Sequence, residues 1–107
     1  MGIQIEGHHV RVSQGLREHV QKKVDGLGRY FDRLHGVRVI LRVEESKRAS
    51  AEILCGLVRG RQLVAKADHE DLQQAIDLAE HKARELLRKY KDRLRCRKGE
   101  RPAAGTQ

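Results

Sequence analysis

The chain has 107 residues, of which 36% are charged and 38% hydrophobic, with a formal net charge of +8 and a pI near 10.0. This length suits one domain with one modest core, and no apolar run is long enough to span a membrane. The positive charge favours an acidic partner, nucleic acid before an anionic membrane surface. Tyr30, Phe31 and Tyr90 are the only aromatic residues. This scarcity argues against binding of stacked single-stranded bases and leaves contacts with phosphates and nucleic-acid shape.

The amino-terminal third predicts one strand and one helix. Ile3 and Ile5 alternate with polar residues, which is typical of a short strand. Ser13 is a suitable N-cap, and apolar residues then recur at helical spacing, so we expect a helix from about Gln14 to Asp32.

A row of cations follows the polar side of this helix and is formed by Lys22, Arg29 and Arg33. We call it the first-helix row. Glu18 and Asp25 stand four residues before Lys22 and Arg29, which is the spacing of helical ion pairs. The row therefore has two interpretations: a solvated face neutralised by its own carboxylates, or part of a surface for a polyanion.

Three further strands are predicted, each with its apolar residues at odd-numbered positions. They cover residues 37–43, 49–57 and 63–67. Antiparallel pairing keeps these apolar sets on one face only if the connecting loops contain an odd number of residues. We therefore predict three-residue loops at Glu45–Lys47 and Arg59–Arg61, with Gly60 near a left-handed conformation.

The second predicted helix has one apolar side and one basic side, and Asp68 is its expected cap. Lys82–Lys98 holds nine Lys or Arg residues against two acids, Glu85 and Asp92, and so carries seven of the eight net charges. Its regularly spaced cations form what we call the second-helix ridge: Arg84, Arg88, Lys91, Arg95 and Lys98. We expect them on the side opposite the apolar stripe. Compensation of the helix dipole explains one or two cations near the end but not five, so the ridge predicts a polyanion-binding surface.

The order of elements predicts an α+β fold, β-α-β-β-β-α, with a four-stranded mixed sheet and two roughly parallel helices on one face. The first two strands would be parallel and joined by a right-handed crossover, and the others would form a meander. Because each strand has one apolar face, both helices should cover the same side and bring the row beside the ridge. We expect one domain over residues 1–98 and a disordered tail over residues 99–107.

No arrangement of residues suggests catalysis or metal binding. The six histidines are dispersed, and neither a glycine-rich phosphate loop nor a nucleophile elbow occurs. Cys55 occupies an inward strand position and Cys96 lies in the basic segment, so they form neither a disulfide framework nor a zinc site. We expect no enzyme activity, no cofactor and no metal. Without a signal-peptide pattern, the expected location is the cytoplasm.

Three segments carry a resemblance to a known family. They are Leu16–Phe31, Leu63–Leu72, and Gln74–Asp77 followed by Leu86–Lys91. In their order and spacing, from Met1 to about Lys98, the chain resembles the ribosome hibernation-promoting, or sigma-factor-modulation-like, proteins of bacteria and plastids.

The resemblance implies a non-enzymatic factor that settles between the head and body of the small ribosomal subunit. There it would grip ribosomal RNA where messenger RNA and the A- and P-site transfer RNAs lie, and stop translation. By position, the resemblance implies RNA-binding roles for Arg17, Lys23 and Arg29 and for Arg84, Arg88, Lys91 and Arg95. It also implies a short form without a dimerising domain, which we expect to be a monomer in isolation. Such a form would either need a companion factor to pair ribosomes or would only silence single ones. Together with the row and the ridge, the candidate RNA-binding residues are Arg17, Lys22, Lys23, Arg29, Arg33, Arg84, Arg88, Lys91, Arg95 and Lys98.

Two other functions fit the same residues. A general double-stranded RNA-binding domain shares the two-helix-on-sheet plan and the charge, and the sequence does not separate an RNA duplex from a ribosomal groove. A regulator of RNA polymerase or its sigma factor is the third possibility, and it predicts association with polymerase.

Overall fold

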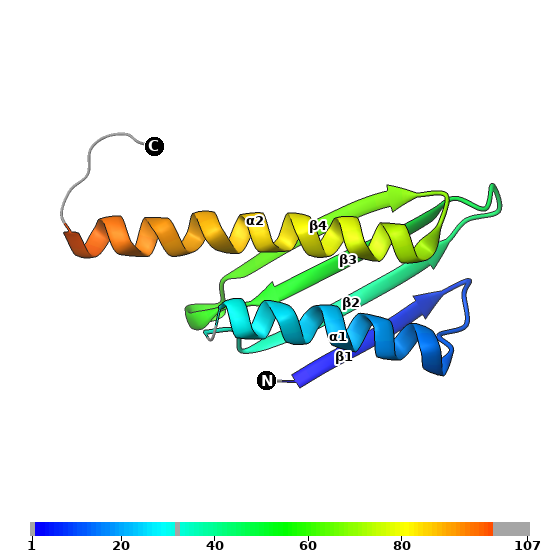
Figure 1. Ribbon diagram of the computed structural model, residues 1–107, viewed down its shortest axis with the longest axis horizontal. Helices are drawn as coiled ribbons and strands as arrows, with labels where there is room; N and C mark the ends of the chain where they lie inside the picture. Colours follow the sequence, from blue (N-terminus) through cyan, green and yellow to red (C-terminus); the bar gives the residue numbers. More distant parts are fainter. Residues whose placement is uncertain (1, 32, 100–107) are drawn as a thin grey trace.

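The computed structural model describes residues 2–31 and 33–99, with side chains up to residue 93. Its elements are β1 (Gly2–His8), α1 (Gln14–Tyr30), β2 (Gly36–Val43), β3 (Ala49–Gly56), a single 3-10 turn η1 (Val58–Gly60), β4 (Gln62–His69) and α2 (Leu72–Gly99). The order of helices and strands is the predicted β-α-β-β-β-α (Figure 1).

The four strands form one mixed sheet in the order β1-β2-β3-β4. β1 runs parallel to β2, and the β2–β3 and β3–β4 pairs are antiparallel. Both helices lie across the same face of the sheet and run in the same direction, and α2 continues beyond the end of the sheet (Figure 1). The predicted mixed sheet with two parallel helices on one face is therefore confirmed.

The sheet separates odd-numbered from even-numbered residues. Val39, Ile53 and Ala65 stand side by side on neighbouring strands and are buried beneath the helices. Their even-numbered neighbours, such as Glu52 and Lys66, face the uncovered side, where only partial burial is possible. The core thus lies in one layer between the helices and one face of the sheet.

The loop between β2 and β3 has the predicted length and position. The Glu44 amide donates to the Arg48 carbonyl at 2.9 Å, so Glu45–Lys47 is a three-residue loop. Lys47 has a φ of 67° and its amide donates to the Glu44 carbonyl at 2.8 Å, which closes the turn.

The loop between β3 and β4 lies one residue earlier than predicted. The Leu57 amide donates to the Arg61 carbonyl at 2.7 Å, so the three loop residues are Val58–Gly60 and the predicted loop at Arg59–Arg61 is wrong. Gly60 has a φ of 72° and adopts the expected left-handed conformation. The odd loop length is preserved, so the apolar residues of β4 still face the helices.

The start of α2 also differs from the prediction. β4 continues to His69, and Asp68 pairs with Ser50 inside the sheet instead of capping a helix. Asp71 is the cap, because its carboxylate accepts from the Gln73 amide at 3.1 Å. Ser13 caps α1 as predicted, through a 3.2 Å bond from the Leu16 amide. α1 ends at Tyr30, before the expected Asp32, and Gly99 belongs to α2 instead of to the predicted tail. The rest of the predicted tail, residues 100–107, lies outside the described residues.

Two glycines give a first prediction, with opposite signs. A methyl group at Gly7 would lie 2.6 Å from the Val10 carbonyl oxygen, whereas one at Gly26 would meet only the end of Arg84, at 3.5 Å. Gly7→Ala should lower the free energy of unfolding by about 2 kcal/mol, because backbone would have to move. Gly26→Ala should raise it by up to about 1 kcal/mol, since alanine is the better helix former. Urea unfolding measures both, and equal effects would contradict the packing described at Gly7.

The thiol of Cys55 gives a second prediction. Cys55 is 1% exposed, as expected from its inward strand position, and burial raises the pKa of its thiol to about 11. In a Cys96→Ser background, labelling at pH 8.5 should be about 100-fold or more slower in the folded protein than in denaturant, because little thiolate forms. Folding excludes the thiolate, so alkaline pH approaching 11 should destabilise the protein. Rapid labelling of the folded protein at pH 8.5 would contradict this burial.

Candidate nucleic-acid interface

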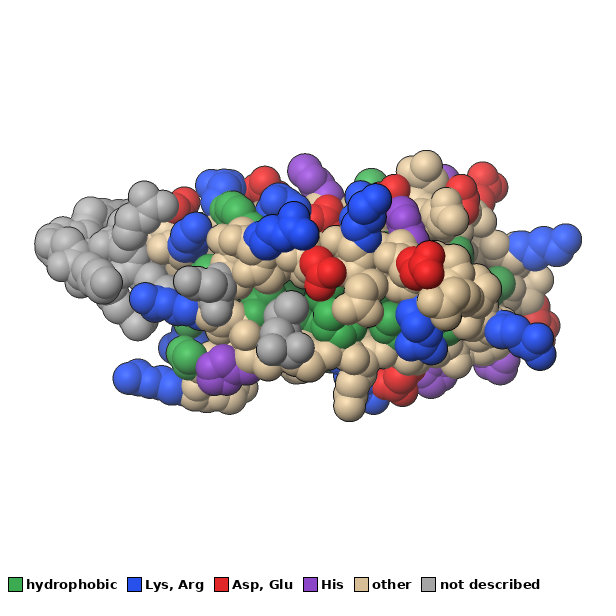
Figure 2. All heavy atoms as spheres, turned by 60° about the horizontal axis from the view of Figure 1, so that its bottom comes forward, with side chains coloured by type: hydrophobic (Ala, Val, Ile, Leu, Met, Phe, Trp, Pro, Cys, Tyr) green, Lys and Arg blue, Asp and Glu red, His purple; other side chains and the backbone are tan. Residues whose placement is uncertain are grey.

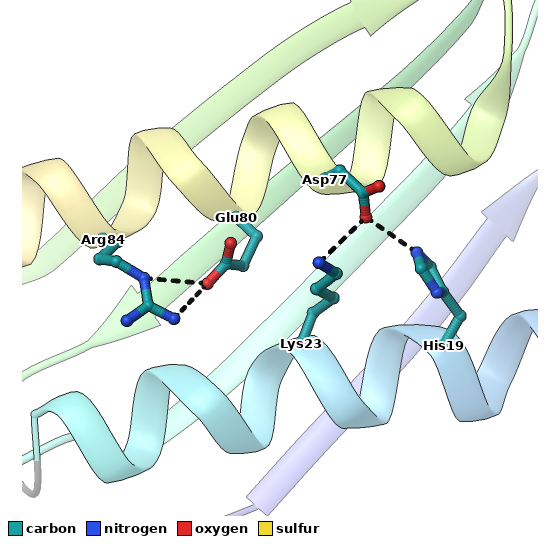
Figure 3. A network of polar contacts seen from close by, with 5 residues as sticks. All are labelled: His19, Lys23, Asp77, Glu80 and Arg84. Carbon is teal, nitrogen blue, oxygen red and sulfur yellow. Dashed lines mark hydrogen bonds and ion pairs between the residues drawn. The ribbon is translucent and has the colours of Figure 1, made fainter.

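α1 and α2 pack side by side, and polar groups from both helices meet along the line of contact. We call this line the interhelical seam; its residues are His19, Lys23, Gly26 and Tyr30 of α1 with Asp77, Glu80, Arg84 and Lys91 of α2. Figure 3 shows its amino-terminal part, where side chains of the two helices point toward one another.

Asp77 links the helices at the beginning of the seam. Its Oδ1 oxygen lies 2.9 Å from Nε2 of His19 and 3.4 Å from Nζ of Lys23 (Figure 3). The carboxylate is 39% exposed, so water screens these contacts. Lys23, a candidate RNA-binding residue, therefore already has a carboxylate partner.

Arg84 turns toward α1 instead of away from the core. Its Nε and Nη2 atoms donate to one oxygen of Glu80, at 3.2 and 2.7 Å (Figure 3). The Glu80 side chain is only 11% exposed, so its charge needs this partner. The guanidinium carbon of Arg84 lies 5.4 Å from the centre of the Tyr30 ring, within the range of a cation–π contact.

Lys91 reaches the same tyrosine two helical turns later. Its ammonium nitrogen lies 4.8 Å from the centre of the Tyr30 ring and donates to the Tyr30 carbonyl at 3.3 Å. Tyr30 is the last residue of α1, where carbonyl groups have no partner inside the helix. Lys91 therefore supplies a hydrogen-bond donor to the end of α1 and is also partly exposed at the surface.

Arg88 lies on the outer side of α2 between two carboxylates. Its guanidinium is 2.9 Å from Glu85 and 3.4 Å from Asp92. The hydrogen bond and charge of Arg88 lower the pKa of Glu85, and the same hydrogen bond and charge of Glu85 raise the pKa of Arg88. Both side chains are about half exposed, so water screens this pair and a phosphate group can replace either partner.

The first-helix row is freer than its spacing indicated. Lys22, Arg29 and Arg33 are exposed, and none of them forms an ion pair or side-chain hydrogen bond with another described residue. The two helical pairs that the spacing allowed are absent among these residues, and Glu18 accepts from Gln14 instead, at 3.1 Å. Arg17 is also exposed and lacks a described partner.

The second-helix ridge is less free than predicted. Arg84 and Lys91 are half-buried against α1, so the expectation that the ridge lies opposite the packed side is wrong for these two residues. Arg95 and Lys98 lie outside the residues whose side chains are described. In Figure 2 Lys and Arg side chains alternate with carboxylates on the visible face instead of forming an unbroken basic patch.

Tyr30 and Glu80 organise the seam but were not among the candidate residues. Glu80 could have been found, because it stands four residues before Arg84 on the same helix. Tyr30 gave no such signal, since Lys91 is 61 residues away and only the fold brings them together.

Two other kinds of site are absent from the described ranges, residues 2–31 and 33–99. No helix there is both long and apolar enough to cross a membrane. No group of three or more His, Cys, Asp or Glu side chains in the same ranges could hold a metal ion.

The fold and the seam define a class of small α+β domains that present cations from two parallel helices on one side of a sheet. The chain belongs to the family described as sigma 54 modulation protein / S30EA ribosomal protein, whose model matches residues 3–95.

Sequence and structural relatives agree with this membership. The chain is 39% identical to the ribosome hibernation promoting factor of Azotobacter vinelandii over 104 residues, which are 96% of the chain and 95% of that protein. It is 37% identical to the factor of the same name from Escherichia coli K12 over 95 residues, 89% of the chain and 98% of that protein.

Among solved structures, a ribosomal subunit interface protein from Coxiella burnetii is similar with a TM-score of 0.78 and 28% identity, covering 86% of the chain and 99% of that structure. The amino-terminal domain of Protein Y from Thermus thermophilus is similar with a TM-score of 0.75 and 28% identity, covering 84% of the chain and 99% of that structure.

The Asp77 contacts give a third prediction. Asp77→Ala should lower the free energy of unfolding by about 0.5–1 kcal/mol, because it removes the acceptor shared by His19 and Lys23 at a half-exposed position. Asp25→Ala is the matched control: it removes an exposed α1 carboxylate without a described partner and should change stability less. Chemical unfolding compares them, and equal losses would mean that the interhelical contacts contribute nothing.

Proposed function

We propose that this protein is a non-catalytic ribosome hibernation factor that binds the small ribosomal subunit through cations of α1 and α2. The observation that carries the proposal is the near end-to-end match to proteins named ribosome hibernation promoting factor, at 37–39% identity over 95–98% of their lengths. The 104-residue match to the Azotobacter vinelandii protein covers both helices.

The arrangement of charge supports binding to folded RNA. Phosphate contacts need exposed Lys and Arg side chains, and those of the first-helix row have no described protein partner to release before binding. α2 extends past the sheet in an elongated molecule of 49 × 26 × 20 Å, a shape that can enter a groove (Figure 1). Inhibition then needs no chemistry, because bound protein occupies the positions of messenger RNA and the A- and P-site transfer RNAs.

The candidate residues divide by their present partners. Lys22, Arg29 and Arg33 can contribute full charges, together with Arg17 at the start of α1. Lys23 and Arg84 share their charges with Asp77 and Glu80. Arg88 can exchange its exposed carboxylate partners for phosphate. Arg95 and Lys98 remain part of the proposed surface by their position in the sequence.

A charge-reversal experiment tests the proposal. Arg29→Glu/Arg88→Glu should weaken binding to purified small subunits by about 100-fold or more, because two phosphate contacts become repulsions. Arg42→Glu/Arg48→Glu is the matched control: it changes the net charge equally but lies on the uncovered sheet face and its adjoining loop. Sedimentation through sucrose gradients measures binding, and thermal unfolding checks that all variants fold.

The same gradients separate the competing functions. Co-sedimentation with small subunits, lost in the Arg29/Arg88 variant and kept in the control, supports hibernation. Equal affinity for any RNA duplex would instead identify a general RNA-binding domain. Migration with RNA polymerase, or equal loss in both variants, would reject the proposed surface.

A further inference from the structure

Two cations of α2, Arg84 and Lys91, approach the ring of Tyr30 at the end of α1. Arg84 and Lys91 stand seven positions apart, which is about two turns, so they lie on the same side of α2. Both extend to the Tyr30 ring, and Lys91 also donates to its carbonyl. The end of α1 therefore gathers two positive charges from the neighbouring helix.

Gathering two like charges costs free energy unless something offsets the repulsion. Three groups do so here. The negative face of the Tyr30 ring attracts both cations, its backbone carbonyl accepts from Lys91, and the carboxylate of Glu80 accepts from Arg84. The Arg84 guanidinium lies against α1 beside Gly26, where an added methyl group would stand at an ordinary contact distance of 3.5 Å from Nη2.

Donors remain after these contacts. Arg84 uses its Nε and Nη2 atoms on Glu80, while Nη1 has no described acceptor, and its side chain is 43% exposed. The Lys91 ammonium has three hydrogens and donates one of them to the Tyr30 carbonyl. Both side chains are partly exposed and keep donors that an anion such as phosphate can use.

We propose that Tyr30 is a positioning residue that holds Arg84 and Lys91 together as one preformed site for a backbone phosphate of RNA. The identity of the ligand rests on the proposed function, whereas the positioning by Tyr30 does not. The ring is not available for stacking with RNA bases in this arrangement, because Arg84 and Lys91 lie over it. Its contribution is to reduce the side-chain freedom that Arg84 and Lys91 would lose on binding.

Two substitutions distinguish the effect of the aromatic π face from the effect of an apolar side chain at this position. Tyr30→Leu keeps an apolar side chain without a π face, and Tyr30→Phe keeps the face. Tyr30→Leu should weaken binding to small subunits, and to a synthetic RNA duplex, by about fivefold, while Tyr30→Phe stays within about twofold. Tyr30 carries no charge, so a merely structural role would leave the salt dependence unchanged. Positioning predicts that the slope of log K against log salt becomes shallower by up to about 1 in Tyr30→Leu.

A spectroscopic readout follows the geometry without any ligand. The Nε–H proton of Arg84 should show a ring-current shift in the NMR spectra of the wild type and Tyr30→Phe, and lose it in Tyr30→Leu. A double-mutant cycle then tests coupling. In an Arg84→Met/Lys91→Met background, Tyr30→Leu should cause no further loss of affinity, because no cations remain to be positioned.

The outcomes for Tyr30 and for ribosome binding are distinguishable. If the wild type binds subunits and Tyr30→Leu binds equally well with an unchanged salt slope, the positioning role is overturned while the proposed function stands. If the wild type does not bind subunits, the proposed function fails, and the phosphate site is judged on the RNA duplex. Equal duplex binding by Tyr30→Leu and Tyr30→Phe would then overturn it as well.

Discussion

The alternation of side chains across the sheet is the constraint on which the rest of the molecule depends. The antiparallel strands are joined by three-residue loops, and the parallel pair sets Ile3 beside Val37, so apolar odd-numbered residues of all four strands share one face. Both helices have to cover that face, and a sheet of four strands leaves them side by side. The seam between α1 and α2, with its two sets of cations, is a consequence of this arrangement. A one-residue change in either loop would place the core of a strand in water.

This constraint also explains how much of the fold could be predicted. The odd numbering of the apolar residues required loops with an odd number of residues, but it did not distinguish pairing registers that differ by two residues. Leu57 could therefore have paired with Leu63, whereas it pairs with Arg61. The same ambiguity affected the start of α2. Asp68 and Asp71 are both plausible caps by residue type. The partner strand decides, because β3 extends to Ala49 and holds His69 opposite, which leaves only Asp71 free to cap.

The candidate site was predictable in composition but not in its contacts. Helical spacing allowed Asp25 to pair with Arg29 and Glu80 with Arg84, and only the second pair forms. The difference is burial: Glu80 is enclosed at the seam and needs a partner, whereas Asp25 is exposed and can be solvated. Contacts such as His19 with Asp77 span 58 residues, and no local pattern encodes them. As a result, the sequence predicted too few protein partners for the cations of the second-helix ridge and too many for those of the first-helix row.

The two sets of cations are therefore suited to different parts of one binding event. Exposed, unpaired charges act over about a Debye length and attract a polyanion before contact, but their long side chains fix no orientation. The positive charges of Lys23 and Arg84 in the seam are partly offset by Asp77 and Glu80. The seam cations are nevertheless held in place by neighbours on both helices. In the proposed complex with ribosomal RNA, attraction would come mainly from the first-helix row and orientation from the seam cations. A surface of free lysines alone would bind any nucleic acid, whereas in the proposed complex the cations held at the end of the seam would fix the orientation of the bound backbone.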